Sequence, residues 1–195
     1  KVKEDILIEE LTGRTKVLVK DRVVLAIQDS SDMSLNAHRN RLKENSGLGR
    51  TDDSKGSIGF KIHPTLVVDA ESLYPLGFSS LAVWHRPLEM PDRHQRDYQK
   101  LKIEEKESYK WIRASNESKE ILADAEQVII IQDREGDIYD QLSQIPDDKH
   151  HLLIRSSTNR KLVDGARLWD VLGSQQSMGT YQIEVAGDPR KKITR

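Results

Sequence analysis

The sequence predicts a mixed α/β sheet flanked by helices. Two near-continuous apolar runs, at residues 22–29 and 127–133, are typical of strands buried on both faces. Residues 58–69 and 76–84 predict two further strands, and their short connection favours an antiparallel hairpin. Apolar residues recur at helical spacing over residues 104–125, which predicts a helix that connects the hairpin to the second apolar run.

The first part of the chain adds one helix and one loop. Residues 5–18 predict a short amphipathic helix. Its apolar positions are Ile6, Leu7, Ile8, Leu11 and Val17. The strand over residues 22–29 ends on Asp29, and the polar segment 30–55 is predicted to be a loop.

The second part alternates between strands and helices. After a polar loop at 86–102 and the helix at 104–125, the strand at 127–133 ends on Asp133. The remaining predicted elements are a helix at 137–145 with Ile138, Leu142 and Ile145 facing inward, a strand at 151–155, a small helix at 167–172 and a strand at 180–185. A three-strand antiparallel meander followed by parallel strands with crossover helices is the layout of an RNase H-like fold.

Composition excludes several classes of protein. The 195 residues fit one domain, and 31 basic against 32 acidic residues leave a net charge of -1, so any binding of nucleic acid must use local patches. Without cysteine there is no disulfide scaffold, thiolate zinc site or cysteine nucleophile. No apolar run has the roughly 20 residues that a membrane span needs. The chain has no initial Met and no signal peptide, so we expect a fragment of a longer protein.

Two similar segments carry the candidate chemistry. Residues 25–29 and 129–133 are both apolar runs that end in Gln-Asp, so neighbouring strands would bring Asp29 and Asp133 together. Two close carboxylates repel each other, and a divalent cation relieves that repulsion. Ligands that are all oxygen suit Mg²⁺ or Mn²⁺, and a pair of such ions can promote phosphodiester displacement. The alternative is that each Asp only caps the turn after its strand.

Five segments, in order, resemble the DDE transposases of bacterial insertion sequences. They are Ala26-Ile27-Gln28-Asp29-Ser30-Ser31, the helix start at 105–111 (EKESYKW), Gln132-Asp133-Arg134-Glu135-Gly136-Asp137-Ile138, Leu153-Ile154-Arg155-Ser156, and Gly179-Thr180-Tyr181-Gln182-Ile183. The last is similar to the first strand of the β-rich insertion in the hairpin-forming, cut-and-paste subgroup.

The resemblance implies a catalytic core at 1–178, the start of the insertion at 179–195, and DNA transposition as the function of the full-length protein. Asp29 and Asp133 would be the first two catalytic, metal-binding carboxylates, with two Mg²⁺ or Mn²⁺ ions in the complete site. The third carboxylate of the family, a Glu in a Y-x-x-R-x-x-x-E helix, has no counterpart here, so we expect the fragment to be inactive alone. The implied partner is double-stranded DNA, both transposon ends and target, which would bridge a homodimer of the full-length protein in the bacterial cytoplasm at the nucleoid.

Other polar residues have both a functional and a structural interpretation. Arg155, Arg160 and Lys161 match a region that contacts DNA phosphates in the family, but they could also form a solvated face. The same alternatives apply to a basic patch in the first loop, which comprises Arg39, Arg41, Lys43, Arg50 and Lys55. A structural role is the expectation for the rest: capping for Glu135 and Asp137, a loop position for Asp32, and core positions for His63, Trp84 and Trp111.

Three other functions stay open on the sequence alone. A stand-alone RNase H-like nuclease would use the same carboxylates, but it would lack the insertion-like strand. A catalytically inactive, transposase-derived protein would bind DNA or a partner. A metal-dependent adhesion site would need a second Ser where the chain has Met33.

Overall fold

The computed structural model describes residues 3–37, 47–51, 57–88, 100–180 and 182. The chain divides into two compact units, Lys1–Ser157 and Thr158–Arg195. The sheet and its helices belong to the first unit. The predicted boundary between residues 178 and 179 stays a prediction, and most of the predicted strand at 180–185 lies outside the described residues.

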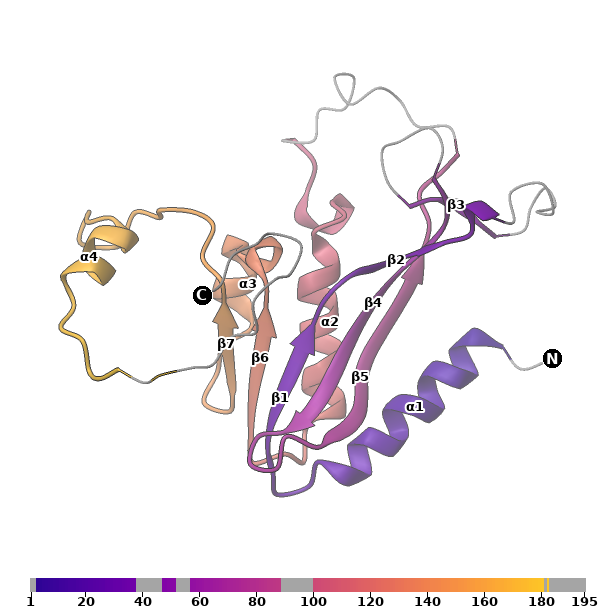
Figure 1. Ribbon diagram of the computed structural model, residues 1–195, viewed down its shortest axis with the longest axis horizontal. Coiled ribbons are helices and arrows are strands. Elements are labelled where there is room, and N and C mark those ends of the chain that lie inside the picture. Colours follow the sequence, from indigo (N-terminus) through magenta and orange to yellow (C-terminus); the bar gives the residue numbers. More distant parts are fainter. Residues whose placement is uncertain (1–2, 38–46, 52–56, 89–99, 181, 183–195) are drawn as a thin grey trace. The chain divides into compact units, whose positions relative to one another are not determined.

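The first unit contains one mixed sheet. Its strands are β1 (Val23–Gln28), β2 (Ser31–Ser34), β3 (Gly49–Arg50), β4 (Ile58–Asp69), β5 (Pro75–Trp84), β6 (Gln127–Gln132) and β7 (His150–Ile154). The order is β2-β4-β1-β6-β7, and β3 and β5 also pair with β4. Strand β4 is antiparallel to β1 and β5, whereas β1, β6 and β7 are parallel. The prediction of a mixed α/β sheet is therefore confirmed (Figure 1).

Helix α2 (Tyr109–Ile121) covers the sheet from behind in the view of Figure 1. The helices are α1 (Glu4–Leu18), α2 (Tyr109–Ile121), α3 (Tyr139–Gln144) and α4 (Leu168–Ser174), with 3-10 turns at Ile103–Glu105 and Arg134–Gly136. The core comprises Val19, Val24, Ala26, Val67, Ile112, Leu122, Ala125, Val128, Ile130 and Ile145. Helix α2 begins five residues later than predicted, because the Glu105 carboxylate accepts a hydrogen bond from the Lys102 amide and closes a separate short turn.

Helix α1 has a different buried face from the predicted one. Its buried residues are Thr12 and Thr15, while four of the five predicted inward positions are exposed, at 52% for Ile6, 53% for Leu7, 40% for Leu11 and 78% for Val17. The two threonine hydroxyls bond to the carbonyls of Ile8 and Leu11, so both can be buried without an unpaired polar group. These small side chains let the helix lie close against β5.

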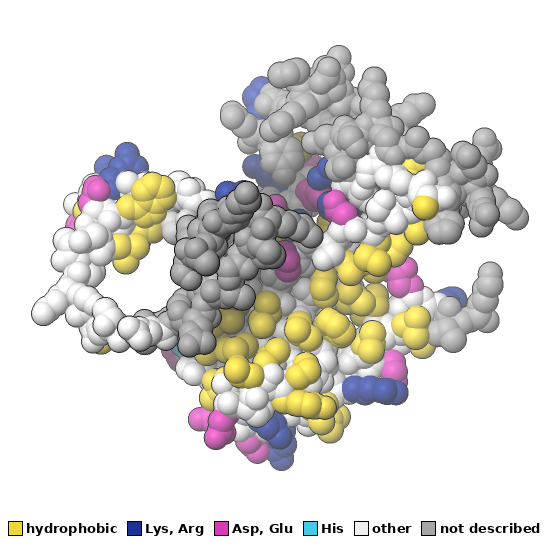
Figure 2. Space-filling model, in the orientation of Figure 1, with side chains coloured by type: hydrophobic (Ala, Val, Ile, Leu, Met, Phe, Trp, Pro, Cys, Tyr) yellow, Lys and Arg dark blue, Asp and Glu magenta, His cyan; other side chains and the backbone are white. Residues whose placement is uncertain are grey.

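Strands β1 and β6 are not buried on both faces, as their apolar runs predicted. In each strand, buried residues alternate with half-buried ones, such as Leu25 and Ile27 in β1 and Ile129 and Ile131 in β6. The buried set packs beneath α2, and the half-buried set lies on the opposite face, where Figure 2 shows apolar side chains over the strands. The apolar runs therefore predicted the two strands correctly, but not that only one face of each strand is fully buried.

Two smaller predictions are also wrong. The loop predicted at 30–55 contains the short strands β2 and β3, both paired with β4. Leu142, expected to face inward, is 40% exposed, because α3 is only six residues long and buries Gln141 instead. None of the helices in the described parts of the chain is long and apolar enough to cross a bilayer.

Candidate active site at the carboxyl edge of the sheet

Three parallel strands end side by side at one edge of the sheet. Ile27 of β1 pairs with Ile131 of β6, and Gln132 of β6 pairs with Ile154 of β7. Asp29 follows β1, and Asp133 and Arg155 directly follow β6 and β7. The two aspartates therefore leave neighbouring strands at the same level. The three arrowheads point the same way in Figure 1.

Asp29 lies where the chain passes from β1 to β2. Both strands pair with β4, β1 with residues 65–69 and β2 with residues 59–62, so Asp29 and Ser30 form the break between two consecutive ladders. The Asp29 side chain is exposed, and its Oδ1 accepts a hydrogen bond from the Ser30 amide at 2.7 Å. This break turns the carboxylate out of the sheet and into solvent.

Asp133 caps the 3-10 turn that follows β6. Its Oδ1 accepts the Glu135 amide at 2.8 Å, which is the capping role considered as the alternative to metal binding. Within the described ranges, Oδ2 of Asp133 and Oδ2 of Asp29 have no hydrogen-bond partner. A capped carboxylate with one oxygen unused can still act as a ligand, so capping and metal binding are compatible.

His63 is buried beside Asp29. Its Nδ1 lies 2.9 Å from the Ser30 hydroxyl, and its ring meets Trp111 edge-on with 4.5 Å between centroids. Burial is the main cause that lowers the pKa of His63, the nearby Lys110 cation adds to the effect, and a hydrogen bond with the Asp29 backbone opposes it; together they bring the pKa to about 4. The ring is therefore neutral at physiological pH. The expectation that His63 belongs to the core is confirmed by its 0% exposure.

A lysine lies between two indole rings near the same edge. Nζ of Lys110 is 5.7 Å from the ring centroid of Trp84 and 5.5 Å from that of Trp111. It also lies 3.5 Å from the Glu135 carboxylate. These contacts occupy Glu135, and the Asp137 carboxylate accepts the amide and hydroxyl of Ser157. Neither of these two acids therefore caps a helix in the described bonds; both hold loops at the sheet edge.

A buried amide cluster, which the sequence did not predict, lies beneath the two aspartates. Gln132 Nε2 donates to Gln28 Oε1 at 2.7 Å, and the side chains of Gln28, Gln132 and Gln141 all reach Ser115 Oγ, at 3.2, 3.3 and 2.7 Å. All four residues are at most 4% exposed. The signal in the sequence was the repeated Ile-Gln-Asp at residues 27–29 and 131–133.

The candidate DNA-binding residues fall into two groups. Arg155 is exposed at the edge of the sheet, where its amide donates to the Gln132 carbonyl at 3.3 Å. Arg160 and Lys161 belong to the second unit, in which Lys161 forms a β-bridge with Arg167. Of the predicted basic patch, Arg50 is in β3, and Arg39, Arg41, Lys43 and Lys55 lie outside the described residues. Asp32, predicted to be in a loop, is on β2 and forms an ion pair with Lys61.

The donor set at this edge suits a hard divalent cation but does not complete a site. Within the described parts of the chain, no three His, Cys, Asp or Glu residues group closely enough to hold a metal ion. Asp29 and Asp133 supply carboxylate oxygens only, which favours Mg²⁺ or Mn²⁺ over zinc. Further ligands would have to come from the substrate, from water or from another part of the protein.

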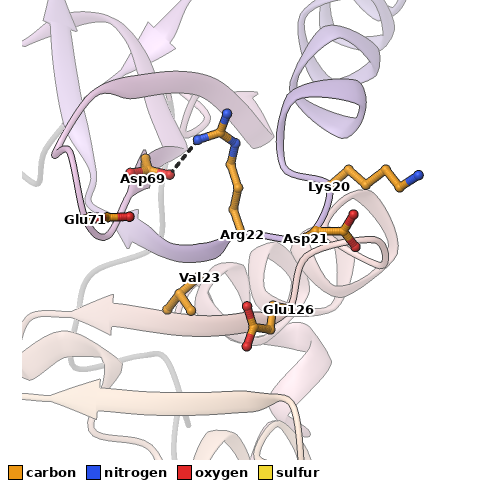
Figure 3. A pocket seen from close by; sticks show the side chains of 7 residues that line it. All are labelled: Lys20, Asp21, Arg22, Val23, Asp69, Glu71 and Glu126. Atoms are coloured by element: carbon orange, nitrogen blue, oxygen red, sulfur yellow. Dashed lines mark hydrogen bonds and ion pairs between the residues drawn. The ribbon is translucent and has the colours of Figure 1, made fainter.

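A cavity of about 400 Å³ lies at the opposite end of β1 (Figure 3). Its lining comprises Lys20, Asp21, Arg22, Val23, Asp69, Glu71 and Glu126. Hydrogen bonds from the Ser72 amide and hydroxyl, together with Arg22 at 2.9 Å, lower the pKa of Asp69 to about 2. Asp69 therefore ties the turn between β4 and β5 to the start of β1, which is a structural role.

No known protein family matches the sequence, and no curated protein matches it either.

Proposed function

We propose that the chain is the catalytic part of a DDE-type transposase, and that the full-length protein cleaves and joins DNA phosphodiester bonds at transposon ends. The observation that carries the proposal is the register of β1 and β6, which brings Asp29 and Asp133 to one edge of the sheet. The ordered motifs described in the sequence agree with this placement. The strand order also fits an RNase H-like fold, with β1, β4 and β5 as the antiparallel meander and β6 and β7 as the parallel strands.

The residues at this edge suit phosphodiester chemistry. Asp29 and Asp133 would each give oxygen ligands to divalent ions bound between the strand ends. When bound, a pair of ions supplies an activated water or 3′-hydroxyl and neutralises charge on the leaving oxygen. Arg155, on the next strand, would contact a DNA phosphate close to these carboxylates. The third carboxylate would come from the rest of the full-length protein.

A cleavage assay on the full-length protein tests this proposal. Asp29→Ala and Asp133→Ala should each bind transposon-end DNA with near-normal affinity but reduce nicking by at least about 10³-fold, because the ions would lose an anionic ligand. Asp124→Ala is the matched control, since Asp124 is exposed at the far end of the sheet, just before β6. Nicking at a near-normal rate by either active-edge variant would remove these residues from the site.

The same assay separates the proposed function from its alternatives. A stand-alone nuclease would cleave without preference for a transposon end and would not transfer strands. A catalytically inactive relative would bind DNA but show no metal-dependent nicking in the wild-type protein. Strand transfer that depends on both aspartates supports the transposase alone.

A further inference from the structure

The backbone ladder between β1 and β6 stops short of the two aspartates. We call the line along which β1 and β6 pair the seam, and the last residues paired across it are Ile27 and Ile131. Gln28 pairs instead with Thr65 of β4, and Gln132 pairs with Ile154 of β7, on the outer sides of the seam. The separation of Asp29 and Asp133 is therefore not fixed by backbone hydrogen bonds between their own strands.

A side-chain bond crosses the seam at this level. Gln132 Nε2 donates to Gln28 Oε1 at 2.7 Å, one residue beyond the last backbone pair and one residue before each Asp. Both amides are buried, with exposures of 2% for Gln28 and 4% for Gln132. A hydrogen bond between buried amides is costly to break, because each group would lose its partner without gaining water.

The bridge is anchored on helix α2. Ser115 Oγ donates to the Trp111 carbonyl at 2.8 Å, so its two lone pairs are left to accept from the side-chain amides of Gln28, Gln132 and Gln141, which share them. The Gln141 bond, at 2.7 Å, is the shortest of the three and links α3 to the same hydroxyl. The strand ends and two helices thus meet at one buried oxygen.

We propose that this amide bridge sets the separation of the two aspartates, and that Gln28 and Gln132 are positioning residues for a divalent cation. The inference rests on the proposed function, since it assigns the cation to Asp29 and Asp133. Gln28 and Gln132 touch neither metal nor substrate. They act through the backbone of the next residue in each strand, in the way that residues behind a metal ligand hold its orientation.

The experiment measures Mn²⁺ affinity of the 195-residue chain by electron paramagnetic resonance of the free ion, at a temperature where far-ultraviolet circular dichroism shows every variant folded. Gln28→Met and Gln132→Met keep the length of the side chain but remove the bridge. Each should weaken Mn²⁺ binding about tenfold. Gln127→Met is the matched control, because Gln127 is at the other end of β6, where its side chain meets His151. Its Mn²⁺ affinity should equal that of the wild-type chain.

A double variant separates positioning from simple stabilisation. Each single variant leaves one buried amide without its partner across the seam. The double variant, Gln28→Met with Gln132→Met, removes both amides, so its free energy of unfolding should be higher than that of the single variants. The Mn²⁺ affinity should stay low. Recovery of affinity together with stability would overturn the proposal. If the methionine variants do not fold, Ser115→Ala removes only the anchor and should weaken binding about threefold; unchanged affinity would then overturn the proposal.

Asp29→Asn and Asp133→Asn distinguish failure of this inference from failure of the proposed function. If both lose Mn²⁺ binding while the glutamine variants keep it, the bridge has no positioning role and the metal site stands. If Mn²⁺ binding is absent from the wild-type chain, or unchanged in the asparagine variants, the ion is not held by these aspartates and both proposals fail.

Discussion

At the scale of single residues, the edge of the sheet combines exposed charged groups with buried polar groups that hold them. Asp29 and Asp133 face solvent, while His63, Gln28 and Gln132 lie beneath them with little or no exposure. His63 is hydrogen-bonded to Ser30 and is buried in its neutral form. Gln28 and Gln132 are hydrogen-bonded to each other. Changes of pH and single substitutions should therefore act at defined positions.

Protonation of His63 should destabilise the fold between pH 6.5 and pH 4. The pKa of His63 is about 4 in the folded chain and 6.5 for an ordinary histidine, so in this interval the unfolded chain binds a proton that the folded chain does not. The free energy of unfolding should fall by about 3 kcal/mol across the interval. Urea unfolding of the wild-type chain and of His63→Gln at pH 7 and 4.5 measures this, and the variant should lose less.

Two aspartates, Asp69 and Asp147, should affect the pH dependence of stability only below the ordinary pKa of an aspartate. Lys119 and His150 hold the pKa of Asp147 well below its ordinary value, and Ser72 and Arg22 lower the pKa of Asp69 to about 2. Their stabilising effect is present above the ordinary pKa of an aspartate and is lost below it. An equal fall in stability for wild type and His63→Gln above pH 4 would rule out His63 as the cause.

Arg155 should contribute to DNA affinity in the full-length protein. Arg155→Ala should weaken binding to transposon-end DNA by roughly 5- to 10-fold at low salt and reduce the slope of log affinity against log salt by about 1, since one phosphate contact is lost. Fluorescence anisotropy at several salt concentrations measures both quantities. Lys20→Ala, at the opposite end of the sheet, should change neither. An unchanged salt slope for Arg155→Ala would place this side chain on a solvated face.

At the scale of elements, helix α1 shows how closely a helix can approach a strand. An added Cβ at Gly77 of β5 would lie 2.3 Å from Thr15 Oγ1, and Gly77 has φ of +138°, which is unfavourable for other residues. Gly77→Ala should therefore destabilise the chain by about 1–3 kcal/mol.

Gly13→Ala in α1 is the contrasting change. Among the residues that the structure describes, an added Cβ at Gly13 would meet no atom of a neighbouring element within 4 Å, so the higher helix propensity of Ala should stabilise the chain by up to about 1 kcal/mol. Thermal unfolding of the two variants measures both effects. Equal melting temperatures for Gly77→Ala and the wild-type chain would show that α1 does not need this close contact.

Most elements could be predicted because local spacing determines them. Strand β6 and the hairpin of β4 and β5 lie within a residue or two of their predicted bounds, since apolar runs and turn residues mark them directly. The buried face of α1 could not be predicted, because Thr12 and Thr15 are buried by the shape of β5 rather than by their own hydrophobicity. The amide cluster was missed for a similar reason: polar residues at strand ends are expected in solvent, and only the fold shows that Gln28 and Gln132 face each other.

At the scale of the whole molecule, the core lies entirely within the first unit. All of the core residues fall between Val19 and Ile145. A chain ending at Ser157 keeps the bonds from Ser157 to Asp137 that close the last loop of this unit. Residues 1–157 should therefore unfold in one cooperative transition with a melting temperature within about 5 °C of the full chain. Loss of the transition, followed by circular dichroism, would show that the second unit is needed for folding.

The alternation of side chains along β1 and β6 has a consequence for tolerated changes in length. At the end of each strand, a buried amide is followed directly by an exposed carboxylate, so the two side chains occupy opposite sides of the backbone. Inserting or deleting a single residue within either strand would rotate the charged group into the interior and the amide out to water. Insertions in these two strands should be tolerated only in pairs of residues. The connections at the opposite end of the sheet should accept an odd or an even number of added residues.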